Sequence, residues 1–325
     1  MIAYERRACT VLYNLLACHH PTGPVLLPAN VCPIVPITLH KVGRRFEFVD
    51  ISPSTLCIDH EKLLERWTAS AERPAGLIYA RTFGAIFDAV AVFQEIKRLT
   101  PNALIIDDRC ACAPSFPVDA LLEHVDVVLY STGYAKYADI GFGGYAIVKD
   151  ESLYRRARLA FDERDLEFQT VQYKKALSTR QKFVYVDNTW LDFSDPWSDL
   201  ATYRKMVETQ AKRVSLLKQS INHIYASRLP PEIQLSSAFQ SWRFNIHVAD
   251  KPALMAAIGE AGLFASGHYD SLEGLFGAGT GENARVSHRH IVNLFNDGNF
   301  DVKRAELLAD LIRNTKGIAP SPLSL

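Results

Sequence analysis

The sequence predicts an α/β protein with a mostly parallel central sheet flanked by helices, and a smaller C-terminal α/β domain. Two observations lead to this class. Up to about residue 150, short runs rich in leucine and β-branched residues alternate with longer helical patterns. From residue 151 on, long charged helical patterns replace that alternation. The length of 325 residues exceeds the usual size of one compact domain, which agrees with a large domain and an appended small one.

The elements follow from the spacing of apolar residues along the chain. Helical spacing predicts helices over residues 4–18, 33–42, 59–68 and 89–100. Between and after them, short apolar runs predict strands over 25–28, 45–49, 76–80, 103–107, 125–130 and 144–148. Further helices are expected over 151–167, 200–229, 251–261 and 302–314, with a strand over 240–248. Pro230 and Pro231 stop a helix, so we expect domains over 1–229 and 230–325.

Composition argues against several classes of partner. The 36 basic and 36 acidic side chains cancel, and no stretch concentrates lysine and arginine as a nucleic-acid-binding surface does. No apolar run reaches the ~20 residues of a membrane span, and the N-terminus lacks a signal-peptide layout, so we expect a cytoplasmic protein without membrane contact. The six cysteines lack metal-site spacing and are expected to be free thiols, most of them buried.

In an open α/β sheet, ligand-binding and catalytic residues are expected just beyond the carboxyl ends of the strands. Residues 28–32, 107–112 and 131–136 occupy such positions. Lys136 follows the predicted strand 125–130 and precedes glycines that allow the backbone to approach a ligand closely, which suits a lysine that forms an imine. Alone, such a lysine is more often a solvated side chain.

Residues that could bind a pyridine ring and a phosphate are also present at these positions. The apolar strand ahead of Asp107 and Asp108 presents a carboxylate that can pair with a protonated pyridine nitrogen, as pyridoxal phosphate (PLP) requires. Ser131 offers a hydroxyl to the phosphate, and the first helix begins near Arg7 and Ala8 with free N–H groups and a positive dipole end. An Asp-Asp pair is often only a turn or helix cap, but the order and spacing of these residues favour a PLP site.

These segments together resemble the DegT/DnrJ-type sugar aminotransferase family, which has the fold type I PLP-dependent transferase scaffold. Residues 48–55 preserve most of the family's Phe-Val-Asp-Ile-x-Pro-x-Thr pattern, residues 103–108 resemble its pyridine-binding strand, and residues 131–136 resemble its serine-to-lysine segment. The resemblance spans nearly the whole chain and is strongest over 24–150. It implies that Asp108, rather than Asp107, binds the pyridine nitrogen, that Ser131 contacts phosphate, and that Lys136 forms the internal aldimine.

Several positions depart from the family's pattern. Residues 5–8 replace its small phosphate-binding turn, so phosphate is expected on backbone N–H groups and on Arg7. The aromatic residue that stacks on the cofactor ring corresponds to Cys32, which offers less contact area. A polar residue beyond the pyridine-binding acid corresponds to Ala111. The family also has further residues ahead of the first helix, where part of its substrate site lies.

The resemblance implies a PLP-dependent aminotransferase (transaminase) that takes an amino group from glutamate and gives it to a nucleotide-linked keto sugar, as in the synthesis of cell-surface polysaccharides or antibiotic sugars. Lys136, with its basicity lowered by its surroundings, would carry the proton. A homodimer with the active site at its interface is also implied. The aromatic and acidic residues 190–197 are a candidate interaction loop, lid or subunit contact, although aromatic residues more often pack in the core. Two alternatives stay open: a PLP enzyme of this fold with a non-sugar substrate, and a catalytically silent binding or partner subunit. Cys32 and Ala111 favour the second.

Two further segments have no assigned role. Residues 264–269 could line a substrate mouth or form an ordinary loop, and the sequence favours neither. His288 and His290 are two residues apart and do not share a helical face, so no metal site is expected there. We expect these histidines at a helix end or on the surface.

Overall fold

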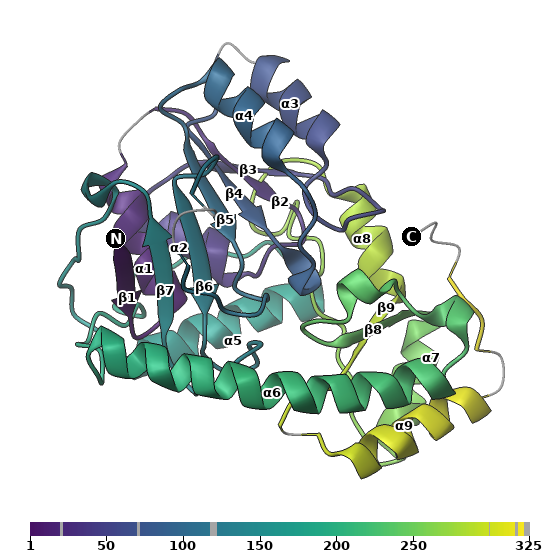
Figure 1. The fold of residues 1–325 in the computed structure, drawn as a ribbon. Coiled ribbons are helices and arrows are strands. Elements are labelled where there is room, and N and C mark those ends of the chain that lie inside the picture. Colours follow the sequence, from purple (N-terminus) through teal and green to yellow (C-terminus); the bar gives the residue numbers. More distant parts are fainter. Residues whose placement is uncertain (20–21, 70–71, 118–121, 299, 316–317, 322–325) are drawn as a thin grey trace.

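A seven-stranded sheet runs through the large N-terminal part of the molecule, drawn in purple to teal in Figure 1. The computed structural model describes residues 1–19, 22–69, 72–117, 122–298, 300–315 and 318–321. Strands β2 to β6 are parallel to one another, β7 pairs antiparallel with β6, and β1 pairs antiparallel with β7. The strands, in their order across the sheet, are β1 (Ile2–Glu5), β7 (Gly144–Val148), β6 (Val127–Ser131), β5 (Leu104–Asp108), β4 (Gly76–Ala80), β2 (Val25–Pro28) and β3 (Phe46–Val49).

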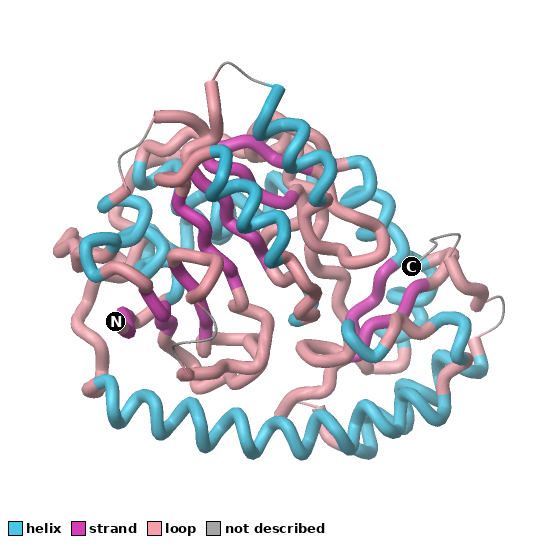
Figure 2. Tube along the Cα trace, turned by 45° about the horizontal axis from the view of Figure 1, so that its top comes forward, coloured by secondary structure: helices cyan, strands magenta, loops and turns pink. Residues whose placement is uncertain are grey.

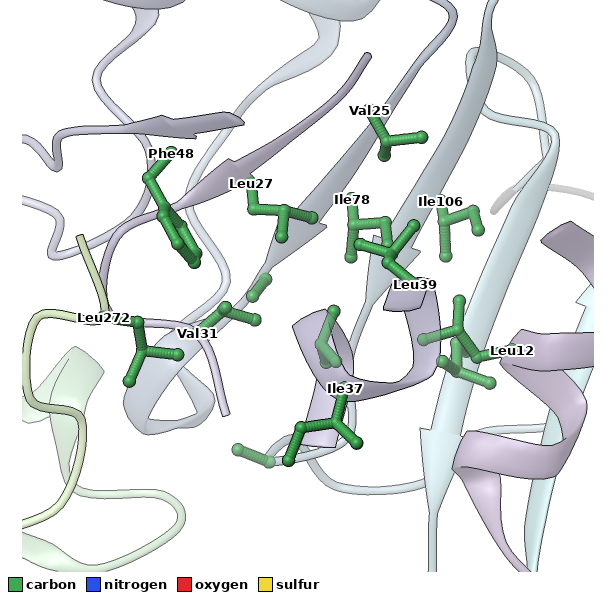
Figure 3. Close-up of a cluster of buried hydrophobic side chains, with 14 of the residues drawn as sticks. Leu12, Val25, Leu27, Val31, Ile37, Leu39, Phe48, Ile78, Ile106 and Leu272 are labelled. Carbon is green, nitrogen blue, oxygen red and sulfur yellow. The ribbon is translucent and has the colours of Figure 1, made fainter. Parts of the chain in front are cut away.

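Helices cover both faces of this sheet. On one face lie α1 (Ala8–Cys18) and α2 (Ile34–Val42), and on the other α3 (His60–Ala69) and α4 (Val90–Leu99). Consecutive residues of a strand therefore enter different cores: Ile78 packs with α1 and α2, whereas Leu77 packs with α3 and α4. Figure 3 shows Ile78 and Ile106 of the sheet facing Leu39 of α2. Burial on both faces explains why these strands are almost continuously apolar in the sequence.

The C-terminal part contains long helices and a two-stranded antiparallel sheet. Helix α6 runs along one side of the molecule from the large sheet to α9, in both Figure 1 and Figure 2. Its last turns contribute Ile221 and Tyr225 to a third core, which also holds Phe244, Val292 and Leu308. The elements are α5 (Glu163–Thr179), α6 (Leu200–Arg228), β8 (Phe244–His247), α7 (Lys251–Glu260), α8 (Glu282–His290), β9 (Ile291–Leu294) and α9 (Val302–Asn314).

Short 3₁₀ turns complete the described segments: η1 (Thr82–Gly84), η2 (Glu151–Leu153), η3 (Pro231–Ile233) and η4 (Ser237–Phe239). The turn η3 begins at the second of the paired prolines, directly after α6 ends. Because the end of α6 belongs to the third core, one helix connects both parts of the chain. The division into domains at residue 229 stays a prediction.

Most predicted elements are confirmed to within a few residues. The strands over 25–28, 76–80 and 144–148 and the helix over 302–314 have the predicted bounds, and the other strands and helices of the first 148 residues shift by one or two positions at their ends, apart from the first helix. The expected strand 240–248 is shorter, covering Phe244–His247. The sequence pattern did not predict α8 or β9.

The predicted start of the first helix is wrong, because residues 2–5 form strand β1. Tyr4 lies in that strand and stacks on Tyr203 of α6, with ring centroids 4.0 Å apart. Glu5, at the end of β1, is buried and accepts a hydrogen bond from the Tyr154 hydroxyl (2.6 Å). The strand covers an edge of β7 that would otherwise present unpaired backbone groups.

The predicted helix over 151–167 is also wrong. Its residues form the short turn η2 and then an irregular segment, and α5 begins only at Glu163, where the Asp162 carboxylate caps the Arg164 N–H (2.9 Å). The irregular segment is attached to the large sheet instead. The Ala157 N–H donates to Asn14 Oδ1 (3.0 Å), a bond that competes with continuation of a helix.

Within the described residues, no helix has the length and apolar character needed to span a membrane.

A buried lysine in α6 makes a prediction about the pH dependence of stability. Burial, assisted by Arg243, lowers the pKa of Lys218 to about 7. The unfolded chain therefore binds more protons than the folded protein between about pH 7 and the ordinary lysine value, and stability must rise with pH over this window, by at most ~1.4 kcal/mol per pH unit. Lys218→Met should flatten this rise in urea unfolding curves between pH 7 and 9.5. Lys205→Met, an exposed lysine of the same helix, should retain the rise; an equal slope in both variants would contradict the assignment.

Candidate active site

A cavity of about 650 Å³ lies at the carboxyl ends of β5 and β6, beside the first turn of α1. This size is within the range of small-molecule sites. The structure brings all six residues predicted for the site to its walls, although they come from four separate stretches of the chain: Lys136, Asp108, Ser131, Arg7, Ala8 and Cys32. Asp108 is the last residue of β5 and Ser131 the last of β6, as the strand-end argument expects.

The loop that carries Lys136 is closed at its base by hydrogen bonds. The Thr132 N–H donates to the Gly143 carbonyl (3.1 Å), and the Ile140 N–H donates to the Thr132 carbonyl (2.9 Å). The Thr132 hydroxyl lies 2.7 Å from the hydroxyl of Tyr203 in α6. These contacts hold the two ends of the loop together between β6 and β7.

The tip of the same loop is held by different contacts. Ala135 has φ +60°, in the left-handed region that is costly for a residue with a Cβ. Its N–H donates to Asp139 Oδ2 (2.8 Å), and its carbonyl accepts the indole N–H of Trp242 (2.8 Å). The Lys136 N–H donates to Gly133 (3.3 Å). Lys136 thus follows a fixed turn rather than a free loop.

The two acids at the tip of β5 have different surroundings. Asp107 is buried between two guanidinium groups: Arg81 Nε lies 2.8 Å from Oδ1, and the nearest nitrogen of Arg109 lies 2.7 Å from Oδ2. Asp108 lines the cavity and accepts the Cys110 N–H (2.9 Å). Burial raises the pKa of Asp108, an effect opposed in part by that bond and by Lys136. A cationic ligand group at this carboxylate would stabilise its charged form.

The charge environment of Lys136 combines burial with nearby acidic groups. Burial alone lowers the pKa of its ammonium group, but the groups around it, Cys32 and Tyr269 foremost, outweigh burial, and Asp108 adds to them. The pKa of Lys136 is therefore raised in the chain without cofactor. The lowered basicity expected of this lysine once it is released from the imine stays a prediction.

Part of the cavity wall is formed by the start of α1. Ala8 is the first residue of this helix, and its N-cap, Arg7, makes no side-chain capping bond. A Cβ on Gly144 would lie 2.3 Å from the Ala8 nitrogen, so only glycine permits this approach of helix to strand. The helix therefore begins directly at the cavity wall with its positive end, an arrangement suited to an anion.

Two arginines and a carboxylate share this end. Arg6 Nε and Arg7 Nε lie 3.5 Å and 3.9 Å from Asp192 Oδ2. The Arg6 guanidinium also lies 3.8 Å from the ring centroid of Trp197. Asp192 and Trp197 belong to the aromatic and acidic segment 190–197, whose remaining aromatic residues, Trp190 and Phe193, are buried. The segment is thus partly core and partly cavity wall, and a contact with a second subunit remains a prediction.

Thiols occupy the wall where the resemblance implies an aromatic ring. Cys32, Cys9 and Cys110 all line the cavity, and the six cysteines are free. Of the six, Cys57 and Cys112 are buried and the other four are half-buried. Burial raises the pKa of the Cys9 thiol to about 11, and it raises the pKa of Cys110 as well. Both groups are therefore protonated at neutral pH and act as small apolar contacts.

Several cavity residues were missed from the sequence. Helix α5 and the residues ahead of it contribute Phe161, Glu163, Leu166, Thr170 and Tyr173 to the wall. The helix was expected too early in the chain, and no spacing pattern connects it with β5 or β6. Only its apolar positions signal that it packs against something.

The segment 264–269 does not belong to the described cavity lining. Tyr269 still lies close enough to influence Lys136, and its ring packs edge-on against Phe83 (5.0 Å). His288 and His290 end α8, and the His288 ring contacts Asp270 (3.3 Å between Nδ1 and Oδ1). The helix-end expectation for these histidines is confirmed.

The fold of the chain is found among solved aminotransferases. A DegT DnrJ EryC1 StrS aminotransferase from Brucella abortus superposes with a TM-score of 0.70 at 16% identity, over 97% of this chain and 86% of that one. A structure of DesI in the presence of its TDP-sugar product gives a TM-score of 0.71 at 15% identity, over 96% and 79%. A putative sugar aminotransferase from Streptococcus pneumoniae, in its PLP-form, gives 0.67 at 14% identity, over 95% and 85%.

No protein-family model matches the sequence, and no curated protein matches it either. At such low identity the superpositions show the fold alone. The chain has the mostly parallel α/β fold of fold type I aminotransferases, as the sequence predicted.

Proposed function

We propose that this protein is a PLP-dependent aminotransferase that moves an amino group from glutamate to a nucleotide-linked keto sugar, with Lys136 as the lysine that binds the cofactor. One observation carries the proposal: Lys136 and Asp108, from neighbouring strand ends, line the same cavity as the positive end of α1. The superposed structures support the substrate class, since one is a putative sugar aminotransferase and another contains a TDP-sugar product.

The described residues fit PLP. Asp108 is a buried carboxylate that needs a cationic partner, and a pyridinium nitrogen provides one. Asp107 is already paired with two arginines and turns away from the cavity lining, which supports Asp108 as the pyridine partner. Ser131, Ala8 and Arg7 would hold the phosphate at the other end.

When bound, the cofactor supplies an electron sink that stabilises the negative charge left on the substrate carbon. The chain's residues then have separable tasks. Asp108 would hold a protonated pyridine nitrogen, and the start of α1 with Ser131 would hold the phosphate. The Lys136 amine, when it is not bound to the cofactor, would take and return a proton at the substrate carbon. The wall from α5 limits the access of water.

Two other readings stay open. Cys32 and Ala111 stand where the family pattern has an aromatic and a polar residue, which favours a catalytically silent binding or partner subunit. A PLP enzyme with a non-sugar substrate would use the same Lys136 and Asp108 and would differ only in its acceptor. A homodimer with the site at its interface and a cytoplasmic location remain part of the proposal.

A half-reaction assay separates the three readings. We expect a visible absorbance band when PLP is added, its loss when L-glutamate is added, and its return with a TDP-linked keto sugar. Absence of any band in the native protein would support the silent subunit. A band that glutamate discharges but that no nucleotide-linked keto sugar restores would support a non-sugar acceptor. D-Glutamate, with the same charge, serves as the control and should leave the band intact.

A further inference from the structure

A tryptophan far along the chain contacts the turn that carries Lys136. Trp242 lies between η4 and β8, is 4% exposed, and donates its indole N–H to the Ala135 carbonyl (2.8 Å). The two residues are 107 positions apart in the sequence. The sequence pattern gave no sign that the segment before β8 reaches the end of β6.

The contact lies at the strained point of the turn. Ala135 has φ +60°, and a residue with a Cβ holds that conformation only when its surroundings fix both of its peptide groups. Asp139 fixes the N–H side and Trp242 fixes the carbonyl side. The peptide that Trp242 holds is the one that joins Ala135 to Lys136. Its orientation therefore sets the direction in which the lysine side chain leaves the turn.

Trp242 is itself held from several sides. Its carbonyl accepts a hydrogen bond from the buried Lys218 of α6 (2.7 Å). Its ring lies 5.3 Å from the rings of His268 and Tyr269, and its Cβ lies 3.2 Å from the place where a Cβ on Gly84 would be. Because the Trp242 indole is held by these contacts, its N–H can fix the position of the Ala135 carbonyl.

We propose that Trp242 is a positioning residue for Lys136: its indole N–H holds the left-handed turn at Ala135, so that the amine points into the cavity. Because Lys218 of α6 bonds the Trp242 carbonyl, the direction of the Lys136 side chain also depends on α6 and on the segment after residue 229. Its benefit to catalysis rests on the proposed function, but the geometric claim does not.

The chain offers a matched control. Trp67 of α3 is fully buried and donates its indole N–H to Thr100 Oγ1 (3.0 Å), away from the cavity. Trp242→Phe and Trp67→Phe each remove one buried indole hydrogen bond and keep an aromatic ring. Comparable losses of stability are expected from both, in the range of one hydrogen bond. A purely structural role for Trp242 predicts that the two variants behave alike at Lys136.

The test uses two readouts on the full chain. Without PLP, reductive ¹³C-methylation and NMR follow the chemical shift of the Lys136 resonance at neutral pH, which is assigned by its absence in Lys136→Arg. With PLP, the dissociation constant is taken from the visible band. For Trp242→Phe we expect the Lys136 shift to move toward that of an exposed lysine and the dissociation constant to rise about fivefold. Neither quantity should change in Trp67→Phe.

Unchanged values in Trp242→Phe, or equal changes in both variants, would overturn the proposal. A native protein that shows no PLP band would refute the proposed function instead. In that case the ¹³C chemical shift of Lys136 still decides whether Trp242 orients Lys136.

Discussion

Lys136→Ala should abolish the visible PLP band and lower transamination by on the order of 10³-fold or more, since the variant loses both the covalent attachment and the group that carries the proton. The side chain lines the cavity without taking part in the core. The fold should therefore survive, and the melting temperature without PLP should stay close to that of the native protein. Absorbance spectra, half-reaction rates and melting curves measure the three quantities.

Lys149→Ala is a suitable control for this variant. Lys149 directly follows β7, is exposed, and its ammonium group donates to the Glu123 carbonyl (3.4 Å). It should retain both the band and the rate. A Lys136→Ala protein that keeps the native band would mean that another amine binds the cofactor.

Asp108→Asn should retain the fold but lower transamination by ~10²–10³-fold, because an amide cannot keep the pyridine nitrogen protonated. The pKa of Asp108 is raised by burial in the folded protein, so any stability that this group contributes is present at low pH and is lost as the pH rises through its folded-state pKa. At neutral pH the neutral amide therefore removes a buried charge. Without PLP, Asp108→Asn should be at least as stable as the native protein.

We expect the reverse effect on stability when the neighbouring acid, Asp107, is substituted. Asp107→Asn leaves Arg81 and Arg109 without their shared carboxylate, and breaking a buried ion pair costs about 3–5 kcal/mol. Urea unfolding should show a large loss of stability in Asp107→Asn and none in Asp108→Asn. If the two variants exchanged these phenotypes, the assignment of the pyridine partner would be wrong.

The sequence predicted the central sheet well because its strands are buried on both faces. Runs such as 25–28 and 76–80 contain almost only apolar residues, as strands that are covered on both faces do. Strand β1 was missed because it has only four residues and is followed almost at once by α1, so its pattern could not be separated from that of the helix. Helix α5 was placed too early because side chains of Asn14 and Asp162, rather than local propensity, decide where it begins.

The site residues that lie at strand ends could be predicted from the sequence. Lys136, Asp108 and Ser131 each follow or end an apolar strand, and parallel strands end at one edge of a sheet. The α5 wall and the contact of Trp242 with the Lys136 turn could not be predicted in this way. They depend on the packing of segments that are distant in the sequence, and no periodicity predicts that packing. The raised basicity of Lys136 belongs to the same group, because it depends on which acidic side chains surround the amine.

The most direct test of the central claim is to reduce the PLP-treated protein with borohydride and locate the modified lysine by peptide mass spectrometry. Burial lowers the pKa of Lys218 to about 7 and that of Lys251 to about 8, so these amines would be the more reactive ones if basicity alone decided. Our account predicts that the pyridoxyl group is found on Lys136, and that Asp108→Asn changes the spectrum of the adduct without moving it. A pyridoxyl group on Lys218 or Lys251, with Lys136 unmodified, would contradict it.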